Sequence, residues 1–347
     1  MVEMSTYRDD ILLLFKEDIP WGKLSGTNIL ITGATGLIGS TLVEVLMSNP
    51  DRDYCVYASS RNVIRAKKMF KDYFPLDSFH YVEYDVMHPL LSGEQFDYII
   101  HAASNASPLF FSKSPVEIIK SNILGVSNLI EYGLEHGMKR FLYISSGEVY
   151  GEGDGRIFSE EYSGYVDCMK PRSCYPSSKR TSETLCVSYS DEYGADVVIA
   201  RPCHIYGPNF TETDNRVYAQ FIRNILNRED IVMKSSGEQY RSWCYSVDCV
   251  SALLFILLKG ESRQAYNIAD PNSIISIREM AEMLARIGDC KVVMEIPSDV
   301  EAKGYTPVSK SVFSVNKLES LGWKVSGSLE TKLIKTIKYL KDKQLTR

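Results

Sequence analysis

The sequence predicts an α/β fold, a doubly wound parallel sheet followed by a smaller C-terminal lobe. Short β-branched runs alternate with amphipathic helical segments through the first two thirds of the chain. That order is typical of a parallel sheet with helices on both faces. The runs are apolar on both faces, as strands covered from both sides must be. A glycine-rich turn joins the first run to the first helix.

The elements follow one another in a regular rhythm that ends near Tyr206. The expected strands are 28–34, 54–59, 80–86, 98–104, 140–146 and 196–202, and the expected helices are 40–48, 114–137 and 177–194. An amphipathic helix is expected over 6–24, ahead of the first strand. Beyond Tyr206 loops dominate, and a strand at 264–270 is expected to rejoin the sheet.

These elements suggest a division of the chain. We expect a helical extension at 1–27 and a dinucleotide-binding domain at 28–203, whose sheet is rejoined by 245–270. A smaller substrate-binding lobe is expected from 204–244 and 271–347.

Composition excludes several classes of partner. The net charge of −5 gives no general attraction to nucleic acid or to an anionic membrane. The apolar run 250–258 is too short to span a bilayer. The eight cysteines include no CxxC, and the five histidines show no metal-ligand spacing. We therefore expect reduced cysteines, no metal and a cytoplasmic enzyme.

The turn after the first strand is expected to bind a pyrophosphate. Its spacing is GxxGxxG, and it lies between a strand and the start of a helix. Glycines permit a sharp turn and close backbone approach, and the helix N-terminus attracts phosphate. This strand–turn–helix is the dinucleotide-binding arrangement of the Rossmann fold. The expected contacts are Gly33, Thr35, Gly36, Leu37, Ile38 and Gly39.

The second strand leaves the identity of the dinucleotide open. NAD-binding sheets place an acid at its end to bind the ribose hydroxyls, whereas here Ser59-Ser60-Arg61 follows. Arg61, helped by Ser60 and Arg65, could accept the 2′-phosphate of NADP. The expected cofactor is NAD, with NADP possible. Further contacts are expected at the ends of the third and fourth strands, from Asp85, Val86, Ala102, Ala103 and Ser104.

A catalytic pair is expected near the end of the fifth strand. Tyr175 and Lys179 have the YxxxK spacing, which places both on one face of a helix. A free phenol titrates near about 10, and a neighbouring ammonium favours its ionised form. Ser146 ends the preceding strand, where doubly wound sheets hold their ligands. Tyr175 is therefore expected to act as a base, with Lys179 tuning it and Ser146 binding a hydroxyl.

These segments together resemble the extended short-chain dehydrogenase/reductases of the NAD-dependent epimerase/dehydratase family. The motifs that carry the likeness are TGATGLIG (32–39), ISSGEVYG (144–151), Tyr175…Lys179 and RPCHIYGP (201–208). Within that family, HAASNASP (101–108), 160–189, DNRVYAQFI (214–222) and GEQYRSWCYSVD (237–248) resemble UDP-glucuronate decarboxylases.

The resemblance implies a nucleotide-sugar enzyme that oxidises the fourth carbon of the sugar transiently. Tyr175 would deprotonate the hydroxyl on that carbon, and Glu148 would act near the fifth carbon, helping to protonate the enolate left by decarboxylation. Pro202 would lie along the cofactor. The implied substrate contacts are Asn105, Ser107, His204, Arg216 and Arg241, the two arginines on the diphosphate.

The same residues also suit a 4-epimerase or an NAD(P)H-dependent keto-sugar reductase. A non-catalytic nucleotide-sugar sensor is disfavoured because it needs no proton-transfer groups. Ser146 stands where many decarboxylases have threonine, His204 where many relatives have asparagine, and Gly147 where 4,6-dehydratases have an acid. That last difference argues against a dehydratase. Relatives pair helices such as 114–136 and 173–193 across a dimer, so a homodimer is expected.

Overall fold

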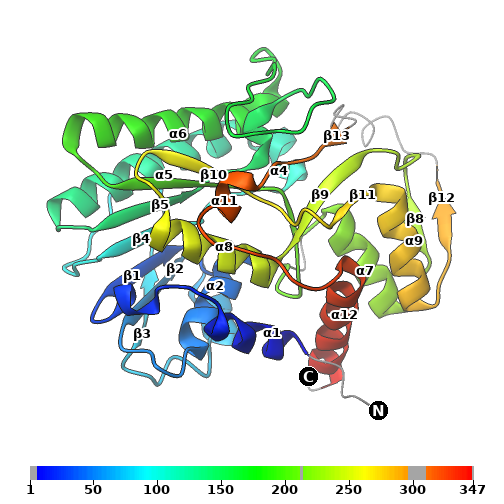
Figure 1. Cartoon of the computed structure of the whole chain (residues 1–347), viewed down its shortest axis with the longest axis horizontal. Coiled ribbons are helices and arrows are strands. Elements are labelled where there is room, and N and C mark those ends of the chain that lie inside the picture. The colour runs from blue at the N-terminus through cyan, green and yellow to red at the C-terminus, as the bar shows by residue number, and fades with distance from the viewer. Residues whose placement is uncertain (1–5, 212–213, 296–309, 346–347) are drawn as a thin grey trace.

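A parallel sheet of seven strands forms the centre of the protein (Figure 1). The structure, a computed structural model, describes residues 6–211, 214–295 and 310–345. Every pairing in the central sheet is parallel, and the strand order is β10-β6-β5-β4-β1-β2-β3. The strands are β1 (Asn28–Thr32), β2 (Cys55–Ser60), β3 (Phe79–Glu83), β4 (Tyr98–His101), β5 (Arg140–Ile144), β6 (Val197–Pro202) and β10 (Gln264–Ile268). The predicted fold class is confirmed, and the strand expected at 264–270 pairs with β6.

Helices cover both faces of this sheet. They are α2 (Leu37–Ser48), α3 (Val63–Met69), α4 (Pro108–Lys113), α5 (Pro115–Glu135), α6 (Cys174–Tyr193) and α8 (Ser246–Lys259). Successive side chains of a strand point to opposite faces. In β1, Ile29 and Ile31 join the cluster that contains α2 and α8, whereas Leu30 joins the one that contains α5. The sheet is therefore buried on both faces, as its apolar strands require.

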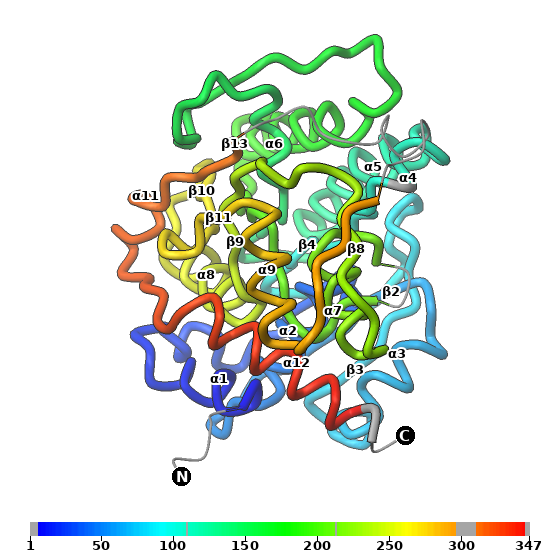
Figure 2. The backbone as a smooth tube through the Cα atoms, turned by 90° about the vertical axis from the view of Figure 1, so that its right-hand side faces the viewer, coloured from blue at the N-terminus to red at the C-terminus, as the bar shows by residue number. Residues whose placement is uncertain are grey.

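The smaller lobe follows β6 in the chain, and Figure 2 shows it in front of the central sheet. Its strands are β7 (His204–Tyr206), β8 (Ile231–Met233), β9 (Tyr240–Tyr245), β11 (Ile274–Ser276), β12 (Val292–Met294) and β13 (Lys310–Ser311), and its helices are α7 (Val217–Asn227), α9 (Ile277–Gly288) and α12 (Leu329–Leu345). β9 pairs with β7, β11 and β13. The short helix α11 (Asn316–Glu319) packs near β10 and α8 instead. Residues 212–213 and 296–309 of the expected lobe lie outside the described residues.

The N-terminal segment differs from the single helix expected over 6–24. Helix α1 spans only Tyr7–Leu13 and is followed by two 3₁₀ turns, η1 (Leu14–Lys16) and η2 (Trp21–Leu24). A capping box between Thr6 and Asp9 begins α1. The chain leaves the helical conformation at Glu17, which has an extended backbone, and Pro20 then precedes the second turn as its N-cap.

Five strands end earlier than the sequence suggests. β1, β5 and β10 stop two residues before the expected ends at 34, 146 and 270, and β3 and β4 stop three residues before 86 and 104. Gly33 ends β1 because its φ of 68° is incompatible with a strand. The residues that follow form loops at the carboxyl edge of the sheet, where doubly wound folds bind ligands.

Candidate active site

The turn after β1 has the shape of a phosphate-binding loop. A Cβ atom on Gly33 would lie 2.7 Å from the carbonyl oxygen of Ala102, and one on Gly39 would collide with the carbonyl oxygen of Gly33. Gly36 is the N-cap residue of α2 and bears no side chain to shield the helix N-terminus. The backbone of the turn and the N-terminus of α2 are therefore accessible to an anionic group, and these residues fit the phosphates of a dinucleotide.

The end of β2 carries polar contacts that bear on the choice of dinucleotide. The Arg61 guanidinium lies 3.9 Å from the Asp85 carboxylate, and both side chains are exposed. Arg65 donates a 2.8 Å hydrogen bond to the carbonyl of Thr35 in the phosphate turn. Ser60 and Tyr81 share a 3.2 Å hydrogen bond. Asp85 therefore brings a carboxylate to the place where β2 lacks one.

A buried chain of hydrogen bonds links β4 to the helix that carries Tyr175. Ser104 donates to Oδ1 of Asn122 at 2.8 Å, and Nδ2 of Asn122 donates to Ser178 at 2.9 Å. Ser178 in turn donates to the carbonyl of Cys174 at 2.6 Å. This chain fixes α5 against α6 and the small residues after β4 against both, since each buried polar group is satisfied. Asn122 was not found from the sequence.

Tyr175 and Lys179 are buried at the start of α6. Burial raises the pKa of Tyr175 to about 12, and its hydrogen bond to Ser146 partly offsets that rise. Lys179 is 1% exposed, and burial lowers its pKa to about 7. Its ammonium donates to the carbonyl of Ile144 at 2.9 Å and lies 5.8 Å from the centre of the Tyr175 ring. Tyr175 is thus in contact with Ser146, and Lys179 lies one turn further along the same helix.

Glu148 meets an arginine that sequence reasoning missed. Nη1 and Nη2 of Arg172 donate to its two carboxylate oxygens at 2.9 and 2.8 Å. Ser146 caps the 3₁₀ turn η3 (Gly147–Tyr150) and accepts from the backbone N–H of Glu148 at 3.2 Å. The two parallel hydrogen bonds from the guanidinium fix the direction of the carboxyl group. To donate a proton, as the resemblance implies, Glu148 would first have to leave Arg172.

Gly147 leaves no space for a side chain. A Cβ atom there would collide with the ring of Phe313, which is 4% exposed and packs on Tyr150 and Phe158. Phe313 comes from the C-terminal segment, more than 160 residues away in the sequence. The position that an acid occupies in 4,6-dehydratases is therefore closed by an aromatic ring.

Polar residues expected to contact substrate gather around the start of α7. Ser107 donates to Asn215 at 2.9 Å, and its backbone N–H donates to the Asn105 side chain at 3.3 Å. Arg216 forms an ion pair with Asp214 at 2.5 Å and donates to Tyr218 at 3.1 Å. Because Asp214 already holds Arg216, a diphosphate would have to compete for this guanidinium.

His204 and Arg241 lie on the neighbouring strands β7 and β9. Desolvation by the surrounding protein, and then the charges of Arg241 and Arg216, lower the pKa of His204, although the residue is exposed. Arg241 is 5% exposed, and burial lowers its pKa to about 10. His204 lies opposite Trp243 in the β7–β9 pairing, two residues along β9 from Arg241. Pro202 ends β6 beside Ile268 of β10.

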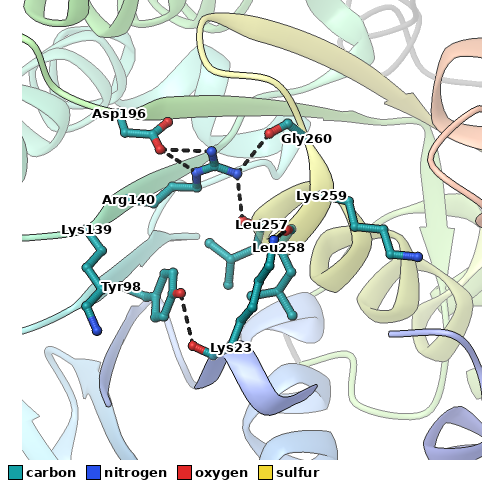
Figure 3. A pocket seen from close by; sticks show the side chains of 9 residues that line it. All are labelled: Lys23, Tyr98, Lys139, Arg140, Asp196, Leu257, Leu258, Lys259 and Gly260. Atoms are coloured by element: carbon teal, nitrogen blue, oxygen red, sulfur yellow. Dashed lines mark hydrogen bonds and ion pairs between the residues drawn. The ribbon is translucent and has the colours of Figure 1, made fainter. Parts of the chain in front are cut away.

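A hollow of about 350 Å³ lies at the amino-terminal edge of the sheet, opposite the carboxyl edge described above (Figure 3). Lys23, Lys139, Arg140 and Lys259 line it, together with Asp196 and the C-terminal end of α8. Arg140 pairs with Asp196 at 2.8 Å and donates to the carbonyls of Leu257 and Gly260. Lys23 donates to the carbonyl of Leu258 at 2.6 Å, so Arg140 and Lys23 cap the C-terminus of α8 and the hollow has a structural role. Within the described residues no acid, cysteine or histidine cluster could hold a metal, and no helix is long and apolar enough to cross a membrane.

Fold and site together define a nucleotide-binding enzyme in which a buried tyrosine and lysine lie at the carboxyl edge of the sheet. The chain belongs to the NAD dependent epimerase/dehydratase family, whose model matches residues 29–269. It is 33% identical over 303 residues to UDP-glucuronic acid decarboxylase 6 of Arabidopsis thaliana, covering 86% of this chain and 84% of that protein. It is 32% identical to UDP-glucuronic acid decarboxylase 1 of Xenopus tropicalis, covering 90% of this chain and 72% of that protein.

Solved structures have the same fold. A UDP-glucose 4-epimerase of Thermotoga maritima, solved with UDP-glucose, matches with a TM-score of 0.78 and 25% identity over 91% of this chain and 99% of that one. A UDP-glucuronic acid 4-epimerase of Bacillus cereus matches with a TM-score of 0.79 and 23% identity over 92% and 99%. The family expected from the motifs is confirmed.

Proposed function

We propose that this protein is a nucleotide-sugar decarboxylase that acts on UDP-glucuronate and binds NAD. The observation that carries the proposal is the ionised Glu148–Arg172 pair, which lies beside Tyr175 and Ser146 at the carboxyl edge of the sheet. The similarity to UDP-glucuronic acid decarboxylases over 86% of the chain supports the same reaction class.

The phosphate turn and the ends of β2 to β4 would hold the dinucleotide. The Arg61–Asp85 contact supports NAD over NADP, because the nearby carboxylate repels a 2′-phosphate and can accept hydrogen bonds from ribose hydroxyls. When bound, NAD supplies reversible oxidation of the fourth carbon of the sugar.

The chain's own residues would move the protons. Tyr175 takes the proton of the 4-hydroxyl, and Ser146 orients that hydroxyl. In the structure Tyr175 is a neutral phenol at neutral pH because burial raises its pKa. A cationic ligand beside it and the Lys179 ammonium both lower that pKa toward the working range.

Loss of carbon dioxide would follow from the 4-keto acid. The bond to the carboxyl carbon breaks, its electrons form the enolate of the ketone, and the fifth carbon then takes a proton. While Arg172 holds it, Glu148 stays a carboxylate, so we assign it the orientation of a water molecule that gives this proton. The resulting hydroxide combines with the released carbon dioxide as bicarbonate.

Rival reactions of the same fold are less well supported. Phe313 closes the position that a dehydratase acid would need at Gly147. A net reductase acting with NADPH would use Arg61 for the 2′-phosphate, but Arg61 faces Asp85. A 4-epimerase shares Tyr175, Lys179 and Ser146, and the solved epimerases share the fold; it has no need of an ionised Glu148 held by Arg172.

Incubation with UDP-glucuronate and a catalytic amount of NAD tests the proposal. Mass spectrometry is expected to detect a UDP-pentose lighter by one carbon dioxide. UDP-galacturonate as the only product, which has the mass of the substrate and is separated from it by chromatography, would establish an epimerase. Unchanged UDP-glucuronate would overturn the substrate assignment, and CDP-, GDP- and dTDP-sugars would then be compared with both cofactors.

We further propose a cytoplasmic homodimer with two functional parts. All eight cysteines are unpaired, which suits a reducing compartment. α5 and α6 expose apolar side chains: Val116 (63%), Ile119 (39%), Leu124 (38%) and Tyr193 (63%). Such side chains on adjacent helices suit a self-complementary contact. Residues 28–203 and 245–270 would bind the cofactor, and 204–244 with 271–347 the nucleotide sugar.

A further inference from the structure

Arg172 lies in the short 3₁₀ helix η4 (Pro171–Ser173), directly before the helix that carries Tyr175. Pro171 begins this turn, and Ser173 donates to the carbonyl of Asp167 at 2.6 Å. The backbone of Arg172 is therefore held at both sides. Its side chain is 28% exposed, and that of Glu148 35%, so the pair between them is partly withdrawn from water.

The same guanidinium also packs on an aromatic ring. It lies 4.8 Å from the ring centre of Phe111 in α4. The Phe111 ring stacks on Tyr175, with ring centres 4.6 Å apart and an angle of 21° between the rings. Phe111 is 1% exposed and Tyr175 is 5% exposed. Arg172 thus contacts Glu148 directly and Tyr175 through one intervening ring.

We propose that Arg172 is a positioning residue that holds Glu148 as a fixed carboxylate and aligns it with Tyr175. The inference rests on the proposed function, and it adds a residue to which neither the motifs nor the resemblance gives a role. A fork of two parallel hydrogen bonds fixes the direction of the carboxylate as well as its charge, which a single contact does not.

Two consequences follow from the charges. Without Arg172, Glu148 loses its fixed direction, so turnover falls while substrate affinity changes little. The negative charge of Glu148 raises the pKa of Tyr175, and without Arg172 that charge would act uncompensated. The acidic limb of the pH–rate profile, which reports the ionisation of Tyr175, is therefore expected to move to higher pH.

A double-mutant cycle with Glu148→Gln and Arg172→Met tests the proposal. In the holoenzyme we expect R172M to lower kcat by about 10- to 100-fold with KM within about threefold. The double variant should be within about twofold of E148Q alone, because Arg172 acts through Glu148. Arg172→Lys keeps the charge without the fork, so its kcat should lie between those of R172M and the wild type.

Arg156→Met is the matched control. Arg156 also pairs with a carboxylate, that of Asp154 at 2.6 Å, and lies 5.5 Å from the ring centre of Tyr162, but it is exposed. Its loss is expected to leave kcat and the pH profile unchanged. A kcat for R172M within twofold of wild type, or independent losses in the double variant, would overturn the proposal.

Urea unfolding of the same four proteins without substrate separates this inference from the proposed function. If the shifts in urea midpoint of the two single variants add up to that of the double variant, the pair does not form in solution. That result overturns the inference whatever the substrate. A wild-type protein that leaves UDP-glucuronate unchanged overturns the proposed function. Non-additive shifts in the urea midpoint, together with non-additive losses of kcat, support both the inference and the proposed function.

Discussion

At the scale of single residues, the site depends on groups whose charge state is set by burial. Tyr175 and Lys179 show this most directly, because burial raises the pKa of the phenol and lowers that of the ammonium. Each shift disfavours the charged form, and a cation bound nearby would favour the phenolate of Tyr175 while disfavouring the ammonium of Lys179. The protonation states of this pair therefore depend on the charge of what binds beside them.

Replacing Tyr175 with phenylalanine removes the proposed base while keeping the ring that stacks on Phe111. We expect turnover to fall by at least about a hundredfold, the usual contribution of a positioned base. Bound NAD, released by denaturation and measured by chromatography, should stay at the wild-type amount. A variant that keeps full activity would show that another group is the base.

His101 gives a prediction for the pH dependence of stability. It is 1% exposed, its Nδ1 lies 2.7 Å from the hydroxyl of Thr32, and burial followed by the charge of Lys179 lowers its pKa to about 3. The native state therefore binds fewer protons than the unfolded state between pH about 6.5 and about 3. Stability is lost as the pH falls through that window, by up to about 1.4 kcal/mol per pH unit from this group.

Urea unfolding of His101→Asn from pH 7.5 to pH 5 tests this dependence. The variant is expected to lose less stability than the wild type over that range. The exposed His80→Asn should follow the wild type. Parallel curves for wild type and H101N would contradict the assignment of a buried neutral imidazole.

At the scale of elements, the sequence motifs predicted where side chains would lie better than which partners they would meet. The residues after β1, β4 and β5 were placed at the carboxyl edge because alternating strands and helices leave only that edge for a ligand. Arg172 lies three residues before Tyr175 in the sequence, so its place near the tyrosine could be predicted. Its partner Glu148 is 24 residues away, and no spacing rule joins a 3₁₀ turn to another across a loop.

Phe313 shows the same limit over a longer distance. Its contact with Gly147 depends on how the C-terminal segment crosses the sheet edge. The single helix expected over 6–24 is wrong for a local reason, because the backbone becomes extended at Glu17 and the apolar pattern does not indicate that break. Strand ends were placed too late because apolar loop residues continued the pattern of the strands.

The phosphate turn gives a prediction for Gly39. In Gly39→Ala the new Cβ would collide with the carbonyl of Gly33, which forces α2 away from the turn and costs about 1–3 kcal/mol. Calorimetry should detect at least about tenfold weaker NAD binding, and urea unfolding a lower stability. Gly22→Ala, where nothing lies within 4 Å, is the control. Unchanged affinity would contradict the role of the turn.

The helices α5 and α6 give a prediction for assembly. If they form the homodimer contact, light scattering at micromolar concentration should give twice the 39.3 kDa chain mass. Ile119→Lys should shift the protein to the monomer. Leu91→Lys, on a residue that is 93% exposed outside these helices, should not. A wild-type monomer would rule out this contact.

At the scale of the whole molecule, the fold brings three distant parts of the chain to one edge. The phosphate turn follows β1, the Tyr–Lys pair follows β5, and Arg216 and Arg241 come from the lobe beyond β6. Under the proposed function, one part of the chain would hold the cofactor while another would hold the nucleotide sugar. The central claim is that oxidation and reduction occur in one cycle at the fourth carbon.

UDP-glucuronate labelled with deuterium at the fourth carbon tests that claim most directly. With catalytic NAD, we expect a UDP-pentose that keeps the label at this carbon, loss of one carbon dioxide, and no net accumulation of NADH in the mass and absorbance records. A labelled substrate that keeps its carboxyl group, or one molecule of NADH formed for each sugar consumed, would contradict the account.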